Sequence, residues 1–492
     1  MLRLLLIGVL LISCAQAQKP NIVLVMADDI GLGDIGFYHK ERTAQESLIP
    51  TPNLDELIRQ GMRFSDAHSP ASLCAPTRFS MMTGNFSYRN KKRPWGVWQP
   101  AVDAGIDPHF HSIARLAKEG GYTTAFFGKW GLGGVWDGWP EEMEGYEQMT
   151  KGARHFGFDY SLELPQGIQN KPFMFFENGK WLKLDAKSKL VELSFEQTRY
   201  EEKEREKKRE GIGDSHWDPA LAGPILANKA VAYIDKQAKT EKPFFMYYCS
   251  QAVHIPHTPA AELNETKIAG TTLGKHGDMI KELDAQVGMI LNALKKNGLY
   301  ENTLFVFTSD NGGLDRGGAL SEAGHAANNG FRAHKGSIYE GGHRVPFIAV
   351  WPGKIAAGSQ SDVTIVGQDM LATVAALAEV PIDTAKVFDS ASLLPLFAQS
   401  SNKALHKYLL HQSQSKWGPY YALREGDWKV VFKTHGREVF KNMKVIGLYN
   451  LTENPYEKAS ENLMDKPEYK DKIEQMKSTY VKLRKQGAST IY

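Results

Sequence analysis

The segment from Asn21 to Asp29 is the feature that most restricts how this chain can fold. It reads NIVLVMADD, an unbroken apolar run that stops at two adjacent aspartates. A run without polar alternation is typical of a strand buried on both faces, as in a parallel sheet covered by helices. Ligand sites of open α/β sheets lie at the carboxyl ends of such strands. The segment therefore predicts a central strand and places Asp28 and Asp29 at a binding edge, although paired aspartates also occur as helix caps.

Further apolar strands alternate with amphipathic helices as far as about residue 400. Strands are expected over residues 122–127, 243–249, 303–307 and 345–351, and long helices over residues 220–239 and 277–298. The second of these helices carries one apolar stripe, with Leu283, Val287, Ile290, Leu291 and Leu294. This alternation predicts an α/β fold in which a large mixed, mostly parallel sheet is sandwiched by helices.

The pattern changes in the last part of the chain. Residues 421–424 and 428–432 are expected to form a hairpin, residues 448–451 a further strand and residues 467–486 a closing helix. A chain of 492 residues exceeds one ordinary core, since cores stop growing near about 250–300 residues. We therefore expect a catalytic domain over residues 18–400 and a smaller C-terminal α+β domain over residues 401–492, built on a short antiparallel sheet.

The first residues have the form of an export signal. Arg3 precedes an apolar run from Leu4 to Ile12, and Ala15-Gln16-Ala17 offers a small-residue cleavage site. We therefore expect residues 1–17 to be a signal peptide and the protein to be secreted or periplasmic. The sequence before Cys14 also resembles a bacterial lipobox, and the alternative is a protein anchored by a lipid on Cys14. No stretch is long and apolar enough for a transmembrane helix.

Charge and cysteine content exclude two classes of protein. The formal net charge is +3 and no basic stripe stands out, which argues against a nucleic-acid partner. The cysteines are Cys14, Cys74 and Cys249, too few for a disulfide framework. With Cys14 in the leader, Cys74 is expected to be free for chemistry.

A second polar pair, Asp310-Asn311, follows the strand expected over residues 303–307. Together with Asp28 and Asp29 it offers hard oxygen ligands, which suit Ca²⁺, with Mg²⁺ as the alternative. Such a cation can hold an anionic ester and act as a Lewis acid. The sequence therefore predicts a divalent metal site where the two strands end.

Cys74 lies in the segment LCAPTRFSMMTG, residues 73–84. The residues after Cys74 are expected to continue as a helix, so that Cys74 lies near a helix N-terminus, where anions are favoured. Read alone, the segment also fits a buried structural cysteine before a proline turn.

The C-x-P-x-R core at Cys74, followed by Thr83-Gly84, resembles the signature of type I sulfatases, the formylglycine-dependent enzymes of the alkaline phosphatase superfamily. Other segments resemble the same family in the same order, so the resemblance covers the chain from about residue 20 to 465. They are residues 21–36 and 308–312 (metal binding), 121–133 (an active-site lysine), 335–346 (K-G-x-x-x-E-G-G-x-R-x-P) and 448–463 (the C-terminal motif).

The resemblance implies that a formylglycine-generating maturation enzyme oxidises Cys74, and that the hydrated aldehyde is the nucleophile. Arg78 would polarise this hydrate, and two lysines would bind sulfate oxygens. The implied catalytic residues are Cys74, Arg78, Lys129, His254 and Lys335, and the implied metal ligands are Asp28, Asp29, Cys74, Asp310 and Asn311.

The segment 254–259, HIPHTP, resembles the family's H-x-P-h-x-P loop. Its first histidine, His254, is implied to be the general acid for the leaving group, a role suited to a side chain that titrates near neutrality. His257 and Arg332 are expected to bind substrate.

One position departs from the family pattern. Many members read G-K-W-H-L-G, with a histidine that contacts the formylglycine, whereas this chain has Gly131 there. The departure concerns how the hydrate is activated and leaves the reaction class unchanged.

We expect a sulfatase that hydrolyses sulfate monoesters of carbohydrates or polysaccharides, and also aryl sulfates, and releases inorganic sulfate. One alternative is a phosphonate or phosphate ester hydrolase of the same superfamily. The other is a non-catalytic protein that binds sulfated glycans.

Overall fold

The computed structural model describes residues 18–106, 110–136, 138–201, 209–314, 318–399, 401–415, 418–434, 440 and 442–485. The expected signal peptide, including Cys14, lies outside these residues and stays a prediction. Among the described residues, no helix combines the length and apolar character needed to cross a membrane.

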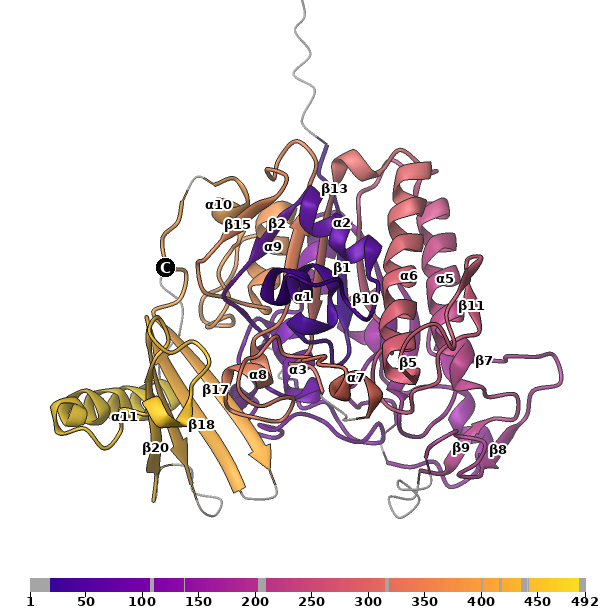
Figure 1. The fold of residues 1–492 in the computed structure, drawn as a ribbon. Coiled ribbons are helices and arrows are strands. Elements are labelled where there is room, and N and C mark those ends of the chain that lie inside the picture. The colour runs from indigo at the N-terminus through magenta and orange to yellow at the C-terminus, as the bar shows by residue number, and fades with distance from the viewer. Residues whose placement is uncertain are drawn as a thin grey trace, which may run out of the picture.

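A ten-stranded sheet forms the centre of the molecule (Figure 1), in the order β15-β2-β14-β13-β1-β10-β4-β5-β6-β7. Its five middle strands pair in parallel: β13 (Thr303–Ser309), β1 (Asn21–Ala27), β10 (Phe244–Cys249), β4 (Thr123–Lys129) and β5 (Tyr160–Ile168). The flanking strands are β15 (Ser359–Ser361), β2 (Met62–Phe64), β14 (Phe347–Val350), β6 (Phe175–Glu177) and β7 (Lys180–Leu182). Antiparallel pairs join β13 to β14, β14 to β2, β5 to β6 and β6 to β7. The prediction of a mixed, mostly parallel sheet is confirmed.

Helices cover both faces of this sheet. One face packs against α1 (Gly36–Thr43), α2 (Pro52–Gln60), α5 (Ala222–Gln237) and α6 (Lys275–Lys296), of which α5 and α6 run side by side (Figure 1). The other face packs against α3 (Cys74–Thr83), α4 (Ile113–Glu119) and α9 (Asp369–Ala378). Within β1, Val23 and Val25 enter the first core, whereas Leu24 and Met26 enter the second. Burial on both faces explains the unbroken apolar run of this strand.

A separate antiparallel sheet lies near the C-terminus and is drawn in yellow in Figure 1. It contains β17 (Tyr408–Ser415), β18 (Gly418–Glu425), β19 (Trp428–Lys433) and β20 (Lys444–Asn450). Helix α11 (Lys470–Lys485) packs on it through Ile473, Met476, Tyr480 and Leu483. The expected small antiparallel sheet and closing helix are thus present, while the division into domains at residue 400 stays a prediction.

Buried ion pairs join this sheet to the rest of the molecule. Lys429, on β19, lies 2.9 Å from a carboxylate oxygen of Glu340 and 2.9 Å from one of Glu457. Arg424, on β18, lies 2.6 Å from Asp66. Breaking a buried pair of this kind leaves an uncompensated charge, so these contacts fix how the two sheets meet.

Candidate active site

The two predicted pairs of metal ligands lie together at the carboxyl edge of the parallel strands. Asp28 and Asp29 follow β1, and Asp310 and Asn311 follow its neighbour β13. The backbone N–H of Asp29 donates a hydrogen bond to Asp310 Oδ1 (3.2 Å), and the amide of Asn311 donates to Asp29 Oδ1 (2.9 Å). Parallel pairing of the two strands is what brings these segments into contact.

Helix α3 carries Cys74 to the same place. Cys74 is the first residue of the helix, and the preceding Leu73 is extended, with φ −141° and ψ 148°. A sulfur or oxygen atom from each of Cys74, Asp28 and Asp310 lies within 4.8 Å of the other two. Arg78 follows four residues after Cys74 and therefore lies on the same face, one turn along. The whole helix is buried.

Arg78 links three of these elements. Its Nη2 donates to Asp310 Oδ2 (2.8 Å), and its Nη1 donates to the carbonyl oxygen of Lys129 (2.6 Å). The same Nη2 lies 3.9 Å from Asp28 Oδ2. The guanidinium is therefore held in one orientation between the ends of β13 and β4.

Two lysines complete the charge balance. Lys129 Nζ donates to Asp28 Oδ2 (2.6 Å), and Lys335 Nζ donates to Asp29 Oδ1. Together with Arg78, these ammonium groups face three buried carboxylates. The structure thus brings the predicted anion-binding lysines to the predicted metal ligands.

The charges shift the pKa values of these groups. Burial opposes ionisation of Asp28 and Asp29, but the ammonium groups of Lys129 and Lys335 outweigh it, and both pKa values are lowered. Burial and the negative charge of Asp28 raise the pKa of Asp310. Despite burial, Asp29 holds the pKa of Lys335 above its usual range.

Several oxygens of this cluster remain without a hydrogen-bond donor among the described residues. They are Asp28 Oδ1, Asp29 Oδ2 and Asn311 Oδ1, and all are buried. A buried carboxylate oxygen without a donor or a cation is costly. Carboxylate and amide oxygens are the ligands that Ca²⁺ and Mg²⁺ prefer, so the residues present fit the predicted divalent cation.

His254 lies beside the same cluster, in the loop after β10. Its Nδ1 lies 2.9 Å from the carbonyl oxygen of Ile255, so Nδ1 carries a proton and donates it. Its Nε2 lies 3.9 Å from Asp29 Oδ2. Burial and the positive charge of Lys335 lower the pKa of His254 to about 3, so the ring is neutral near pH 7. His257 lies three residues on and stacks on His276, with ring centroids 4.8 Å apart.

The structure shows a supporting residue that the sequence analysis missed. Glu282, on α6, accepts hydrogen bonds from Gln251 Nε2 (2.9 Å) and from the backbone N–H of Ala260 (2.7 Å). It thereby holds both ends of the loop that carries His254. In the sequence, Glu282 stands next to the apolar stripe of this helix, which could have indicated a buried carboxylate. Such a carboxylate requires hydrogen-bond partners.

Arg332 is not among the residues brought together here. Its Nη1 donates to Tyr449 Oη (3.0 Å) and to the carbonyl oxygen of Glu457 (2.9 Å), and its guanidinium lies 3.6 Å from the ring centroid of Tyr339. These contacts join it to the C-terminal sheet. Its expected role in substrate binding therefore stays a prediction that none of these contacts supports.

Gly131 lies against Arg78. Its φ is +64°, in the left-handed region, and a Cβ atom there would lie 2.8 Å from Arg78 Cδ. A side chain at this position would therefore displace Arg78 from the arrangement described above.

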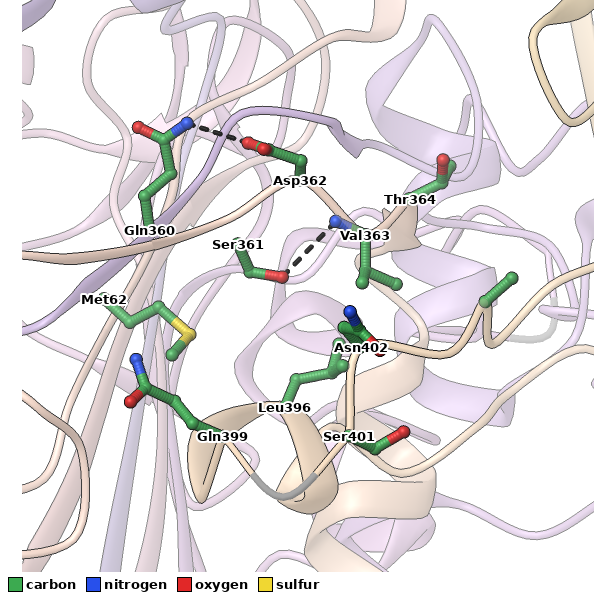
Figure 2. A pocket seen from close by; sticks show the side chains of 11 residues that line it. Met62, Gln360, Ser361, Asp362, Val363, Thr364, Leu396, Gln399, Ser401 and Asn402 are labelled. Atoms are coloured by element: carbon green, nitrogen blue, oxygen red, sulfur yellow. Dashed lines mark hydrogen bonds between the residues drawn. The ribbon is translucent and has the colours of Figure 1, made fainter.

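A large cavity elsewhere does not share this chemistry. A hollow of about 800 Å³ lies beside β15. Figure 2 shows the side chains that line it, which include Met62, Gln360, Asp362 and Asn402. Asp362 is the one ionisable side chain among the described residues of that lining, and it accepts a hydrogen bond from Gln360 Nε2 (2.8 Å). The cavity contains none of the predicted site residues.

Known proteins share both the sequence pattern and the fold. The profile described as Sulfatase matches residues 20–380, and the profile described as N-sulphoglucosamine sulphohydrolase, C-terminal, matches residues 331–486. An N-acetylgalactosamine-6-O-sulfatase of Bacteroides thetaiotaomicron is 30% identical over 483 residues, which cover 90% of this chain and 89% of the relative. Arylsulfatase A of Homo sapiens is 33% identical over 435 residues, which cover 86% of this chain and 76% of the relative.

Solved structures agree with these relatives. One of them comes from work on the metabolism of multiple glycosaminoglycans by Bacteroides thetaiotaomicron. It matches this chain with a TM-score of 0.78 and 26% sequence identity, and the match covers 96% of this chain and 100% of the solved chain. The fold and these matches place the chain among the hydrolases of the alkaline phosphatase superfamily. Within that superfamily it belongs to the sulfatase family, whose named members are sulfuric ester hydrolases.

Proposed function

We propose that this protein is an exported carbohydrate sulfatase that uses a formylglycine formed from Cys74. The observation that carries the proposal is the position of Cys74, at the start of α3 and within 4.8 Å of Asp28 and Asp310. A nucleophile there would lie beside the carboxylates expected to hold the cation, and Arg78 is fixed one helical turn away.

The proposed reaction requires a nucleophile, positive charge and a proton donor. One hydroxyl of the hydrated aldehyde at position 74 attacks sulfur and passes its proton to a carboxylate of the cluster, while the bond from sulfur to the alcohol oxygen breaks and that oxygen takes a proton from His254. The second hydroxyl then gives its proton to His254 Nε2, which the first step leaves unprotonated, the bond from carbon to the sulfate oxygen breaks, and the aldehyde is restored with release of sulfate. A bound Ca²⁺ or Mg²⁺ would supply Lewis acidity toward the sulfate oxygens.

The residues of this chain have separate roles in the proposal. Lys129 and Lys335 are ammonium donors beside the cluster and would bind sulfate oxygens. His254 would deliver a proton to the departing alcohol from Nε2, the ring nitrogen not used in the contact with Ile255. In the free enzyme Nε2 is unprotonated, and the negative charge of a bound sulfate ester would favour its protonation. His257 would contact the alcohol side of the substrate.

Carbohydrate esters are proposed as the substrate because of the relatives. The bacterial relative that is 30% identical is named N-acetylgalactosamine-6-O-sulfatase. Export is proposed from the leader at residues 1–17 alone, with lipid attachment at Cys14 as the alternative.

The test is to express the protein with and without a maturation enzyme and to analyse the peptide that contains residue 74 by mass spectrometry. We expect the aldehyde or its hydrate in active protein, and sulfate release from 6-sulfated N-acetylgalactosamine and from 4-nitrophenyl sulfate. Cys74→Ala should fold and lack turnover. Full activity with only unmodified cysteine at position 74 would refute the mechanism.

A phosphonate or phosphate ester hydrolase is the second candidate. The phosphonate monoester hydrolase of Agrobacterium radiobacter matches with a TM-score of 0.59 and 16% identity, a likeness in fold alone. Matched nitrophenyl sulfate, phosphate and phenylphosphonate esters separate the candidates. A higher kcat/KM for the phosphate or phosphonate esters than for the sulfate ester would favour the phosphonate or phosphate ester hydrolase.

A further inference from the structure

A second cleft, of about 860 Å³, is lined mainly by basic and aromatic side chains. Its walls come from the residues after α3, from the segment before α4, from α4 itself, from residues 151–156 and from the end of α11. We call it the basic cleft and define it by Lys91, Lys92, Arg115, Lys151, Arg484 and Lys485. It contains none of the residues assigned to the active site.

The positive charge of the basic cleft is largely uncompensated. Its one further cation, Arg89, is neutralised by Asp389, at 2.5 and 2.7 Å. The six residues that define the cleft make no ion pair with a described residue, and Asp103 is the one acid among the described residues of the lining. Since the whole chain has a formal net charge of +3, this is a marked local concentration of positive charge.

Arg115 and Arg484 are held in place by neutral groups. Arg115 Nη2 donates to the carbonyl oxygen of His155 (2.9 Å), and Arg484 Nη1 donates to Tyr480 Oη (2.6 Å). Neither contact removes the charge, so both guanidinium groups remain able to pair with an anion. Lys91, Lys92 and Lys485 are exposed, and Lys151 is partly exposed.

Aromatic rings lie between these cations. The lining includes Tyr88, Phe110, Phe156 and Phe388, and the Arg484 guanidinium lies 4.4 Å from the ring centroid of Tyr88. These rings are partly exposed and add apolar contact surface for sugar rings, while the cations bind anionic substituents. The volume lies within the range of about 300–1,000 Å³ typical of ligand pockets.

The active site and the basic cleft lie toward opposite ends of α3. Cys74 begins this helix, and Arg89, in the cleft lining, follows shortly after its end. Phe110 of the lining contacts Phe79 of the helix, with ring centroids 6.2 Å apart. The ten residues of the helix correspond to a length of about 15 Å. A ligand of a few sugar rings has the dimensions to extend from one site toward the other.

We propose that the basic cleft binds a second portion of a sulfated polysaccharide while one sulfate ester of the same chain occupies the active site. The ligand class, a sulfated oligosaccharide with several anionic groups, rests on the proposed function. Charge complementarity favours this ligand over a neutral glycan, and the aromatic lining favours it over a free inorganic anion.

The test compares two triple variants in the Cys74→Ala background, which binds without turnover. In one, Lys91, Lys92 and Lys151 are each changed to Glu. In the matched control, the exposed residues Lys239, Lys242 and Lys267, on a different part of the surface, are changed to Glu. The probes are polymeric chondroitin 6-sulfate, the same polymer after chemical desulfation, and double-stranded DNA, and affinity is measured by fluorescence anisotropy at several salt concentrations.

We expect the cleft variant to bind the sulfated polymer at least tenfold more weakly than the control variant, with a shallower salt dependence. In the active enzyme, the ratio of kcat/KM for the polymer to that for 4-nitrophenyl sulfate should fall at least fivefold in the cleft variant and stay constant in the control. Equal losses in the two variants would overturn the proposal, and so would DNA or the desulfated polymer binding as tightly as the sulfated one. Because binding is measured without turnover, absence of sulfatase activity would refute the proposed function and leave this comparison valid.

Discussion

Replacing Lys129 with Met tests whether the active-site carboxylates are arranged for a cation. Lys129 is 2% exposed, and its ammonium is the one hydrogen-bond donor to the Asp28 carboxylate among the described residues. Removing one partner of a buried ion pair costs about 3–5 kcal/mol, because the other charge stays buried. At about 2 cal/mol/K per residue, a chain of this length loses about 1 °C of Tm for each kcal/mol, so we expect metal-free Lys129→Met to melt about 3–5 °C lower.

Added Ca²⁺ should reverse much of this loss. A ligand at about 100 times its Kd stabilises a protein by about 2.7 kcal/mol. The variant loses one positive charge beside the site and should bind the cation more tightly, so Ca²⁺ should raise its Tm more than it raises that of the parent. The assay is differential scanning calorimetry after chelation, followed by titration with CaCl₂.

Lys429→Met is the matched control for this comparison. Lys429 is also fully buried and lies between two carboxylates, those of Glu340 and Glu457, away from the predicted metal ligands. It should lose comparable stability, and Ca²⁺ should stabilise it no more than the parent. An equal gain from Ca²⁺ in both variants, or no loss of stability in Lys129→Met, would refute the assignment of Asp28 as an ionised metal ligand.

Three further outcomes are expected. His254→Ala should lose about 10²–10⁴-fold in rate on a sugar sulfate and clearly less on an activated aryl sulfate, whereas His257→Ala should raise KM. The measurement is the rate of each variant on sulfate esters of graded leaving-group pKa. A steeper dependence on leaving-group pKa in His257→Ala than in His254→Ala would contradict the assignment. Asp310→Ala should lose bound metal, by elemental analysis, together with activity, and the control Asp362→Ala should keep both; retained metal in the first variant would be the contrary result. Burial raises the pKa of Glu163 to about 7, so this carboxyl favours the folded state below its unfolded pKa of about 4.5 and loses that advantage as the pH rises through 7. Glu163→Gln should therefore gain up to about 3 kcal/mol relative to the parent between pH 4.5 and 8, about 3 °C in Tm by calorimetry, and a pH-independent difference would contradict the buried, protonated state.

The fold was predictable where one physical pattern determined the local structure. The apolar run of β1 indicated burial on both faces, and the structure places alternate residues of this strand in two separate cores. Strand β17 was missed, because its buried positions include His411, Gln412 and Ser413. These polar residues are accommodated by the interior of the molecule, which hydrophobicity along the chain cannot show.

The residue types of the site were predictable from their positions at strand ends, whereas their pairing was not. Asp28 and Asp29 are adjacent in sequence, yet Lys129 contacts one and Lys335 the other. Which ammonium reaches which carboxylate depends on where the end of β4, which carries Lys129, and the loop that carries Lys335 lie relative to β1. The same holds for Glu282, whose role depends on a loop that packs against its helix from elsewhere in the chain.

Gly131 shows why a departure from a family pattern must be read together with its neighbours in space. In sequence, it is a missing histidine. In the structure, its φ of +64° favours glycine, since other residues are disfavoured there by about 1–2 kcal/mol, and a Cβ atom would lie 2.8 Å from Arg78 Cδ. Arg78 is the residue that donates to Asp310 and to the carbonyl oxygen of Lys129. The glycine and the position of Arg78 are therefore one structural feature, in which a backbone without a side chain leaves room for the aliphatic part of Arg78, whose guanidinium lies between the ends of β4 and β13.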